Sequence, residues 1–216
     1  MHFEILVEDQ SGKVMLEILV RKIIGDRHTL KVIAYKGIGR VPTKRPDSGS
    51  VKHRMLLDNL PRLLNGYGKS WENYPAAVFV VCDLDDQCLK TFRQELQTIL
   101  TNCMFKPTTR FCIAVEEGEA WFLGDIAAIK SAYPRAKNSV LSNYKNDSIC
   151  GTWEHLADAI HQGGSADLCT KGWHAVGAEK SEWAKRISPH MNVAENCSPS
   201  FVYFRNKLAE LAQKAG

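Results

Sequence analysis

The segment AAVFVVCDLDD, residues 76–86, is the feature that most constrains the fold. Residues 76–82 are apolar without interruption, whereas a strand with one solvated face would alternate apolar and polar side chains. A strand that is apolar on both faces belongs in the middle of a parallel sheet, with helices covering both sides. The segment then turns acidic at Asp83, Asp85 and Asp86. We therefore expect a buried central strand whose carboxyl end carries a group of acids.

Strand and helix patterns alternate along the first part of the chain. Strands are expected at 3–7, 30–35, 76–86 and 110–117, and helices at 12–24, 51–65, 87–101 and 118–133. Pro61 is expected to kink or break the second helix, because proline has no amide hydrogen to donate. This order of elements is typical of a doubly wound α/β domain.

After about residue 134 the pattern changes to helices, expected at 153–161, 180–187 and 199–214. The last of these has Ser198 as a helix-capping residue and Pro199 at its first position. We therefore predict a Rossmann-like α/β domain over residues 1–133, followed by a helical C-terminal extension over 134–216 that packs on the same core.

Acidic side chains follow three of the four expected strands. Glu8 and Asp9 end the first, Asp83 and Asp85 end the third, and Glu116, Glu117 and Glu119 follow the fourth. Carboxyl ends of parallel strands meet at one edge, where open α/β sheets bind ligands. Asp83 and Asp85 share a side if the backbone stays extended. Converging carboxylates raise each other's pKa values unless a cation neutralises them, and Mg²⁺ or Mn²⁺ suits such oxygen ligands. Each acid alone is equally compatible with a solvated loop.

Three other chemistries fit the sequence poorly. A phosphate-binding P-loop needs G-x-x-x-x-G-K-[ST], but Val7 stands in place of the first glycine and Val14 in place of the hydroxyl residue. The dinucleotide fingerprint G-x-G-x-x-G is absent after the first strand. A phospho-acceptor receiver domain would need a lysine at the end of a fifth strand, and no fifth strand is expected.

The acidic motifs resemble those of the Toprim domain found in topoisomerases, primases and the overcoming-lysogenization-defect nucleases. The resemblance rests on LVED, which contains Glu8, and on VCDLDD, which contains Asp83 and Asp85. Over nearly the whole chain, ILVEDQSGKVMLEILV, VVCDLDD, IAVEEGEAWFLGD and SPSFVYFRNKL resemble small stand-alone Toprim-like proteins. Related sequences often have Gly-x-[ST]-Glu after the first glutamate, whereas this chain has DQSG at residues 9–12.

The resemblance implies a nuclease that depends on Mg²⁺ or Mn²⁺. Glu8, Asp83 and Asp85 would be catalytic, and the same three residues together with Glu117 would hold the metal. Stand-alone Toprim-like proteins are often encoded beside an ATP-binding partner in bacterial defence clusters. The resemblance therefore implies an ATPase partner and an antiviral role. A non-catalytic subunit that uses the same fold for binding is the alternative.

A basic segment follows the second expected strand. Its candidates for nucleic-acid binding are Lys36, Arg40, Lys44, Arg45, Lys52 and Arg54. Phosphate contacts dominate nucleic-acid affinity, so a basic segment near an acidic metal site is the expected complement. A solvated basic surface without a ligand explains the same residues. Whether the substrate would be DNA or RNA stays open, as does the oligomeric state.

Composition indicates a globular protein and a reducing compartment. The net charge is +4, hydrophobic residues make up 44%, and the seven cysteines form no C-x-x-C pair. This spacing disfavours a zinc site and a disulfide framework. No apolar run is long enough to cross a bilayer, and no signal-like segment opens the chain. We therefore expect a cytoplasmic protein.

Overall fold

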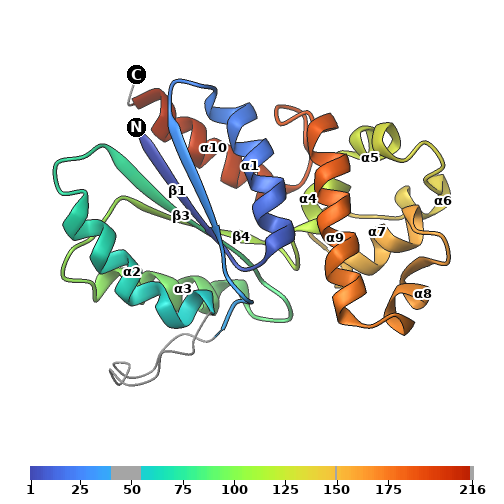
Figure 1. Ribbon diagram of the computed structural model, residues 1–216, viewed down its shortest axis with the longest axis horizontal. Helices are drawn as coiled ribbons and strands as arrows, with labels where there is room; N and C mark the ends of the chain where they lie inside the picture. The colour runs from blue at the N-terminus through green and yellow to red at the C-terminus, as the bar shows by residue number, and fades with distance from the viewer. Residues whose placement is uncertain (40–54, 149, 215–216) are drawn as a thin grey trace.

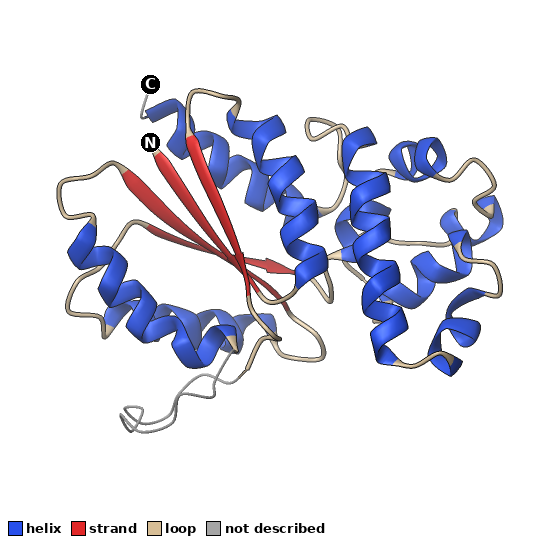
Figure 2. Ribbon diagram, viewed as in Figure 1, coloured by secondary structure: helices blue, strands red, loops and turns tan. Residues whose placement is uncertain are grey.

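The computed structural model describes residues 1–39, 55–148 and 150–214 of the 216-residue chain. Four strands form one parallel sheet: β1 His2–Val7, β2 Thr29–Ala34, β3 Ala76–Asp83 and β4 Thr109–Ala114. Their order across the sheet is β2-β1-β3-β4, so β1 and β3 are central (Figure 1, Figure 2). The prediction of a parallel, Rossmann-like α/β fold with a helical C-terminal part is confirmed. As expected, the apolar segment that begins at Ala76 is an inner strand.

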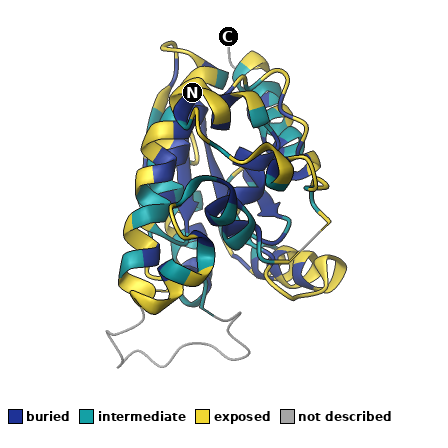
Figure 3. Ribbon diagram, turned by 90° about the vertical axis from the view of Figure 1, so that its right-hand side faces the viewer, coloured by how far each residue is buried: buried dark blue, intermediate teal, exposed yellow. Residues whose placement is uncertain are grey.

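Helices cover both faces of the sheet. Helices α1 Gln10–Ile24 and α10 Pro199–Lys214 lie on one face, and α2 Leu56–Ser70 and α3 Leu89–Thr101 lie on the other (Figure 1). Alternate strand residues point to opposite faces of the sheet. Phe79 and Val81 therefore belong to the hydrophobic core on the side of α1 and α10, whereas Val78 and Val80 belong to the core on the side of α2 and α3. Because each face of β3 is buried by a separate helix pair, its uninterrupted apolar sequence is explained (Figure 3).

The remaining helices gather beside the carboxyl ends of the strands (Figure 1). They are α4 Glu119–Leu123, α5 Ile126–Ala132, α6 Asn138–Leu141, α7 Thr152–Ile160, α8 Gly164–Thr170, α9 Trp173–Ile187 and the short 3₁₀ helix η1 Ser188–His190. Helix α9 packs against α1, and α10 then returns to the sheet. The predicted boundary at residue 134 falls between α5 and α6.

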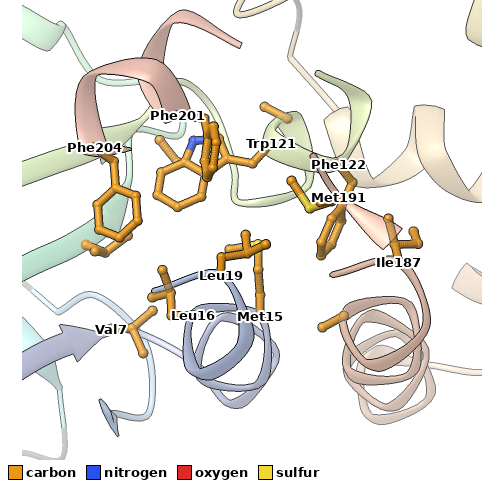
Figure 4. Packing of buried hydrophobic residues seen from close by; sticks show 14 of the residues in the cluster. Val7, Met15, Leu16, Leu19, Trp121, Phe122, Ile187, Met191, Phe201 and Phe204 are labelled. Carbon is orange, nitrogen blue, oxygen red and sulfur yellow. The ribbon is translucent and has the colours of Figure 1, made fainter. Parts of the chain in front are cut away.

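Aromatic side chains fix α10 to the sheet. Phe204 stacks on Trp121 with ring centroids 5.1 Å apart and meets Phe79 of β3 edge-on at 6.0 Å. Phe201 also contacts Trp121, at 5.4 Å (Figure 4). The hydroxyl of Ser198 accepts a hydrogen bond from the Phe201 amide at 3.3 Å, as its predicted capping role requires. The predicted bounds of this helix, 199–214, are confirmed.

Several predicted elements have different bounds. The helix expected over 51–65 is α2, which begins at Leu56 and continues without a break across Pro61. The strands expected at 76–86 and 110–117 end earlier, at Asp83 and Ala114. The helix expected over 180–187 is α9, which begins at Trp173 rather than at residue 180, and the short helices α6 and α8 were not predicted.

The helix expected over 118–133 is divided into α4 and α5 at Gly124 and Asp125. A Cβ at Gly124 would lie 2.4 Å from Asn196 Oδ1, so the chain needs glycine to pass this close. The Asp125 carboxylate accepts hydrogen bonds from the amides of Ala128 at 3.0 Å and Asn192 at 2.7 Å. A tertiary contact with residues 192–196 therefore divides the helix.

No helix in the described parts of the chain has the length and apolar character needed to cross a membrane.

Truncation of Phe204 to alanine tests how strongly α10 supports the sheet. The side chain is fully buried, so we expect Phe204→Ala to lower the free energy of unfolding by about 3–5 kcal/mol. Urea denaturation followed by circular dichroism measures this change. Tyr74 is 53% exposed, and Tyr74→Ala is the control, with an expected effect within about 0.5 kcal/mol. Equal losses in the two variants would contradict a central role for α10.

Candidate functional site: an acidic pocket at the strand ends

The parallel sheet brings the predicted acids to one edge. Glu8 directly follows β1, Asp83 is the last residue of β3, and Glu116 and Glu117 follow β4. A pocket opens here between the strand ends, α1, α4 and α9. Its apolar wall is formed by Val7, Met15, Val81, Trp121 and Phe122, and Figure 4 shows four of these, Val7, Met15, Trp121 and Phe122. Its polar groups include Glu8, Asp9, Asp83, Glu119 and Lys180.

Glu8 and Asp83 form the inner part of the pocket. Their side chains are hydrogen bonded to each other, which requires one of the two carboxyl groups to carry a proton. Burial raises the pKa of Glu8 to about 7 against the opposing effect of this hydrogen bond. Burial, followed by the charge of Glu8, also raises the pKa of Asp83 well above its ordinary value. Glu8 Oε2 is buried without a hydrogen-bond partner among the described residues.

Asp9 has a structural role that the sequence left open. Its carboxylate caps α1, accepting hydrogen bonds from the Gly12 amide and the Ser11 hydroxyl, both at 2.6 Å. A Cβ at Gly12 would lie 2.6 Å from Val7 Cγ2 and 2.9 Å from Asp9 Oδ1. Glycine therefore allows α1 to begin directly after the end of β1, and this start places Glu8 in the pocket.

The loops after β3 and β4 are tied together by backbone hydrogen bonds. The Leu84 amide donates to Ala114 O at 3.0 Å, and the Asp85 amide donates to Glu116 O at 3.0 Å. Asp85 has φ 50° and Glu116 has φ 72°, a left-handed conformation that costs a non-glycine residue about 1–3 kcal/mol. Because the backbone turns here, Asp83 and Asp85 do not continue one extended strand. Asp83 lies inside the pocket, and Asp85 is exposed.

Glu117 and Glu119 surround a buried cation, Lys180 of α9. The Lys180 Nζ lies 3.0 Å from Glu119 Oε2 and 3.7 Å from Glu117 Oε1. Burial of Lys180 disfavours its charge, but Glu119 and Glu117 reverse this effect and raise its pKa. Glu117 Oε2 also accepts hydrogen bonds from the Thr152 hydroxyl and the Trp153 amide, both at 3.1 Å. The first turn of α7 therefore holds Glu117 in place.

The structure brings together most of the predicted site residues. Glu8 and Asp83 are in contact, and Asp85 lies near Glu117, whose charge adds to burial in raising the pKa of Asp85. Glu116 instead turns toward Cys150. The sequence allows Lys180 to line the rim of the site but does not require it to do so. Its spacing from Val176, Ala184 and Ile187, which are all buried, is the signal that marks position 180 as facing the core.

The donor chemistry of the pocket suits a hard divalent cation, but the side chains are arranged around a proton and a lysine. Glu8, Asp83, Asp85 and Glu117 supply only carboxylate oxygens, and Glu8 Oε2 has no partner among the described residues. Within residues 1–39, 55–148 and 150–214, no three Asp, Glu, His or Cys side chains converge closely enough to form a metal-binding group. Metal binding would therefore require these side chains to rotate toward one point.

The predicted nucleic-acid-binding segment is described only at its beginning. Lys36 follows β2 and is exposed. Arg40, Lys44, Arg45, Lys52 and Arg54 lie outside the described residues, and their predicted role stays a prediction.

The raised pKa of Glu8 predicts a pH-dependent stability. Its ordinary pKa of 4.5 applies to the unfolded chain, and its folded value is about 7. The stabilisation from protonated Glu8 is therefore complete below about pH 4.5 and is lost as the pH rises through 7. In urea denaturation with EDTA, we expect Glu8→Gln to reduce this decline in the free energy of unfolding. Glu95→Gln, at an exposed position, is the control. If the free energy of unfolding depends on pH in the same way in the wild type and in Glu8→Gln, the raised pKa of Glu8 is contradicted.

Comparisons with known proteins identify a family without a described activity. No curated protein matches the chain, and no solved structure matches it. One domain family matches, described as a domain of unknown function, DUF4276, and the match covers residues 7–209. This range includes all four acids Glu8, Asp83, Asp85 and Glu117, as well as Lys180. The chain therefore belongs to the DUF4276 family.

Proposed function

We propose that this protein is a nuclease of the Toprim type that depends on a divalent metal ion and hydrolyses phosphodiester bonds in DNA or RNA. The observation that carries the proposal is the Glu8–Asp83 pair, two carboxyl groups hydrogen bonded to each other at the ends of the central strands. Two acids in contact in a partly buried pocket are unfavourable unless a proton or a metal cation lies between them. Mg²⁺ or Mn²⁺ would replace the shared proton.

The acids would divide the work according to their positions. Glu8 and Asp83 would hold the metal from inside the pocket, while Asp85 and Glu117 would approach it from the exposed side. When bound, a divalent metal lowers the pKa of a coordinated water and stabilises charge on phosphoryl oxygens. Glu8 would then orient the attacking water. Lys180 would hold Glu117 and Glu119 beside the site through its ion pairs with both carboxylates.

The cellular context belongs to the same proposal. The Toprim-like motifs favour an ATP-binding partner and an antiviral role as the effector of an ATPase-controlled system. All seven cysteines lie in described parts of the chain as free thiols, which supports a reducing compartment such as the cytoplasm.

Removal of Asp83 tests the proposed activity. We expect Asp83→Asn to lower cleavage of labelled DNA or RNA in Mg²⁺ or Mn²⁺ by about a hundredfold or more, since even outer-sphere partners of metal ligands contribute about 10- to 100-fold. Asp86→Asn removes an exposed carboxylate three residues away and is expected to retain activity within about twofold. If the wild type cleaves nucleic acid, and if Asp83→Asn and the double variant Asp83→Ala with Asp85→Ala cleave it equally well, the proposed site is refuted.

A non-catalytic binding subunit is the second candidate, and Lys180 favours it. The lysine already forms ion pairs with Glu117 and Glu119, so the protein itself supplies a cation to part of the acidic group. In this alternative, the Glu8–Asp83 pair would keep its proton, and the pocket would have a structural role in a protein that binds a partner.

Metal titration separates the two candidates without requiring a substrate. Saturation at 100 times the dissociation constant stabilises a protein by about 2.7 kcal/mol, which corresponds to ~5–10 °C in the melting temperature of a chain this size. We expect this rise with Mg²⁺ or Mn²⁺ in the wild type, with heat released in calorimetry. Asp83→Asn should show neither effect, whereas Asp86→Asn should respond like wild type. A wild type that binds neither ion would favour the binding subunit.

A further inference from the structure

Cationic side chains from three elements meet at the β4 edge of the sheet. Arg93 of α3 donates a hydrogen bond to the hydroxyl of Tyr203 on α10 at 3.3 Å, and its guanidinium lies 5.5 Å from the centre of the Tyr203 ring. Lys207, one turn further along α10, places its Nζ 5.9 Å from the same ring. Tyr203 therefore joins two cations that come from helices on opposite faces of the sheet.

Arg110 of β4 adds a third cation to this edge. Arg110, Arg93 and Lys207 all act on the buried thiol of Cys112. Burial raises the pKa of this thiol to about 12, and the three cations act in the opposite direction. Arg93 and Arg110 form no ion pair with a carboxylate in the described parts of the chain, and Lys207 pairs with the partly exposed Glu210 at 3.3 Å. Positive charge is thus concentrated at the edge with little compensation.

The cationic surface continues along α3 toward the acidic pocket. A surface hollow of about 570 Å³ lies beside α3, and the described residues that line it are Leu89, Lys90, Arg93, Gln94 and Gln97. Lys90, Arg93 and Gln97 recur at helical spacing, so cationic and amide groups share one exposed side of the helix. Helix α3 begins at Leu89, directly after the loop that carries Asp85 and Asp86. The same helix side therefore runs from the acids to Arg93 and Tyr203.

We propose that this basic face, made of Lys90, Arg93, Arg110, Tyr203 and Lys207, binds the phosphate backbone of a nucleic acid and leads it to the acidic pocket. The inference rests on the proposed nuclease function and places its substrate-binding surface at the β4 edge. Arginine forks and lysine heads arranged in a row suit successive phosphates, and the glutamine amides can donate to phosphate or sugar oxygens. An acidic protein surface would match the positive charge of the basic face, but such a partner would not need a row of cations that leads to the acidic pocket.

Binding measured without cleavage tests the basic face directly. The triple variant Arg93→Gln, Arg110→Gln and Lys207→Gln is compared with wild type by fluorescence anisotropy, using labelled single-stranded DNA and RNA in EDTA. Each lost phosphate contact on a single strand removes about 0.7 from the slope of log affinity against log salt, so the slope should fall by about 2. At low salt we expect binding at least about tenfold weaker. The DNA and RNA arms identify which polymer is preferred.

A matched control separates position from net charge. Lys130→Gln, Arg135→Gln and Lys137→Gln remove the same charge from exposed positions on α5 and the segment after it, and this triple variant should bind like wild type. Arg93→Lys retains the charge and should keep most of the affinity. Thermal melts of all variants exclude unfolding as the cause, and if the triple variant melts early, the double variant Arg93→Gln with Lys207→Gln replaces it.

The outcomes distinguish this inference from the nuclease proposal. Equal loss in the two triple variants, or a wild type that binds neither polymer, overturns the basic face. If the wild type cleaves nucleic acid and the basic-face variant still binds it normally, the nuclease proposal stands and the basic face is overturned. Loss of binding only in the basic-face variant supports the inference, even if Asp83→Asn shows that no cleavage depends on the acids.

Discussion

The parallel pairing of β1 with β3 is the constraint on which the rest of the site depends. Val7 lies opposite Val81 in this register, so Glu8, one residue further on, and Asp83, two residues further on, reach the same edge of the sheet. Both strands are buried on both faces, and the acids therefore emerge against an apolar wall rather than into open water. This position raises their pKa values and causes two carboxyl groups to share a proton.

The pocket balances its charges in two separate ways. In the inner part, Glu8 and Asp83 are kept compatible by protonation, because burial outweighs the opposing effect of the Lys180 charge on both of their pKa values. Beside this pair, Lys180 forms ion pairs with Glu119 and Glu117, and the first turn of α7 donates further hydrogen bonds to Glu117. Both Lys180 and α7 come from the helical C-terminal part. The α/β sheet thus supplies the acids, and the later helices supply the cation and the hydrogen bonds that hold Glu117 and Glu119 in place.

Local patterns predicted the fold well, and long-range contacts account for the differences. The apolar sequence of β3 and the capped, striped sequence of α10 are properties of neighbouring residues, so both elements were predicted correctly. The break at Gly124 depends on Asn196, and the buried position of Lys180 depends on the packing of α9 beside the strand ends. The contact of Glu8 with Asp83 was predictable once a parallel sheet was assumed. The capping role of Asp9 was readable from its place before a helix but competed with a role as metal ligand.

The position of α10 also affects how the chain folds as it is synthesised. One face of β3 is completed by Phe204, although 125 residues separate it from its partner Phe79. Until residues 199–214 have left the ribosome, Phe79 and Trp121 lack the rings that cover them. At about 5–20 residues per second, the nascent sheet spends several seconds with an apolar face uncovered. Stable folding of the acidic edge is therefore a late event, and chains interrupted before α10 expose an aggregation-prone surface.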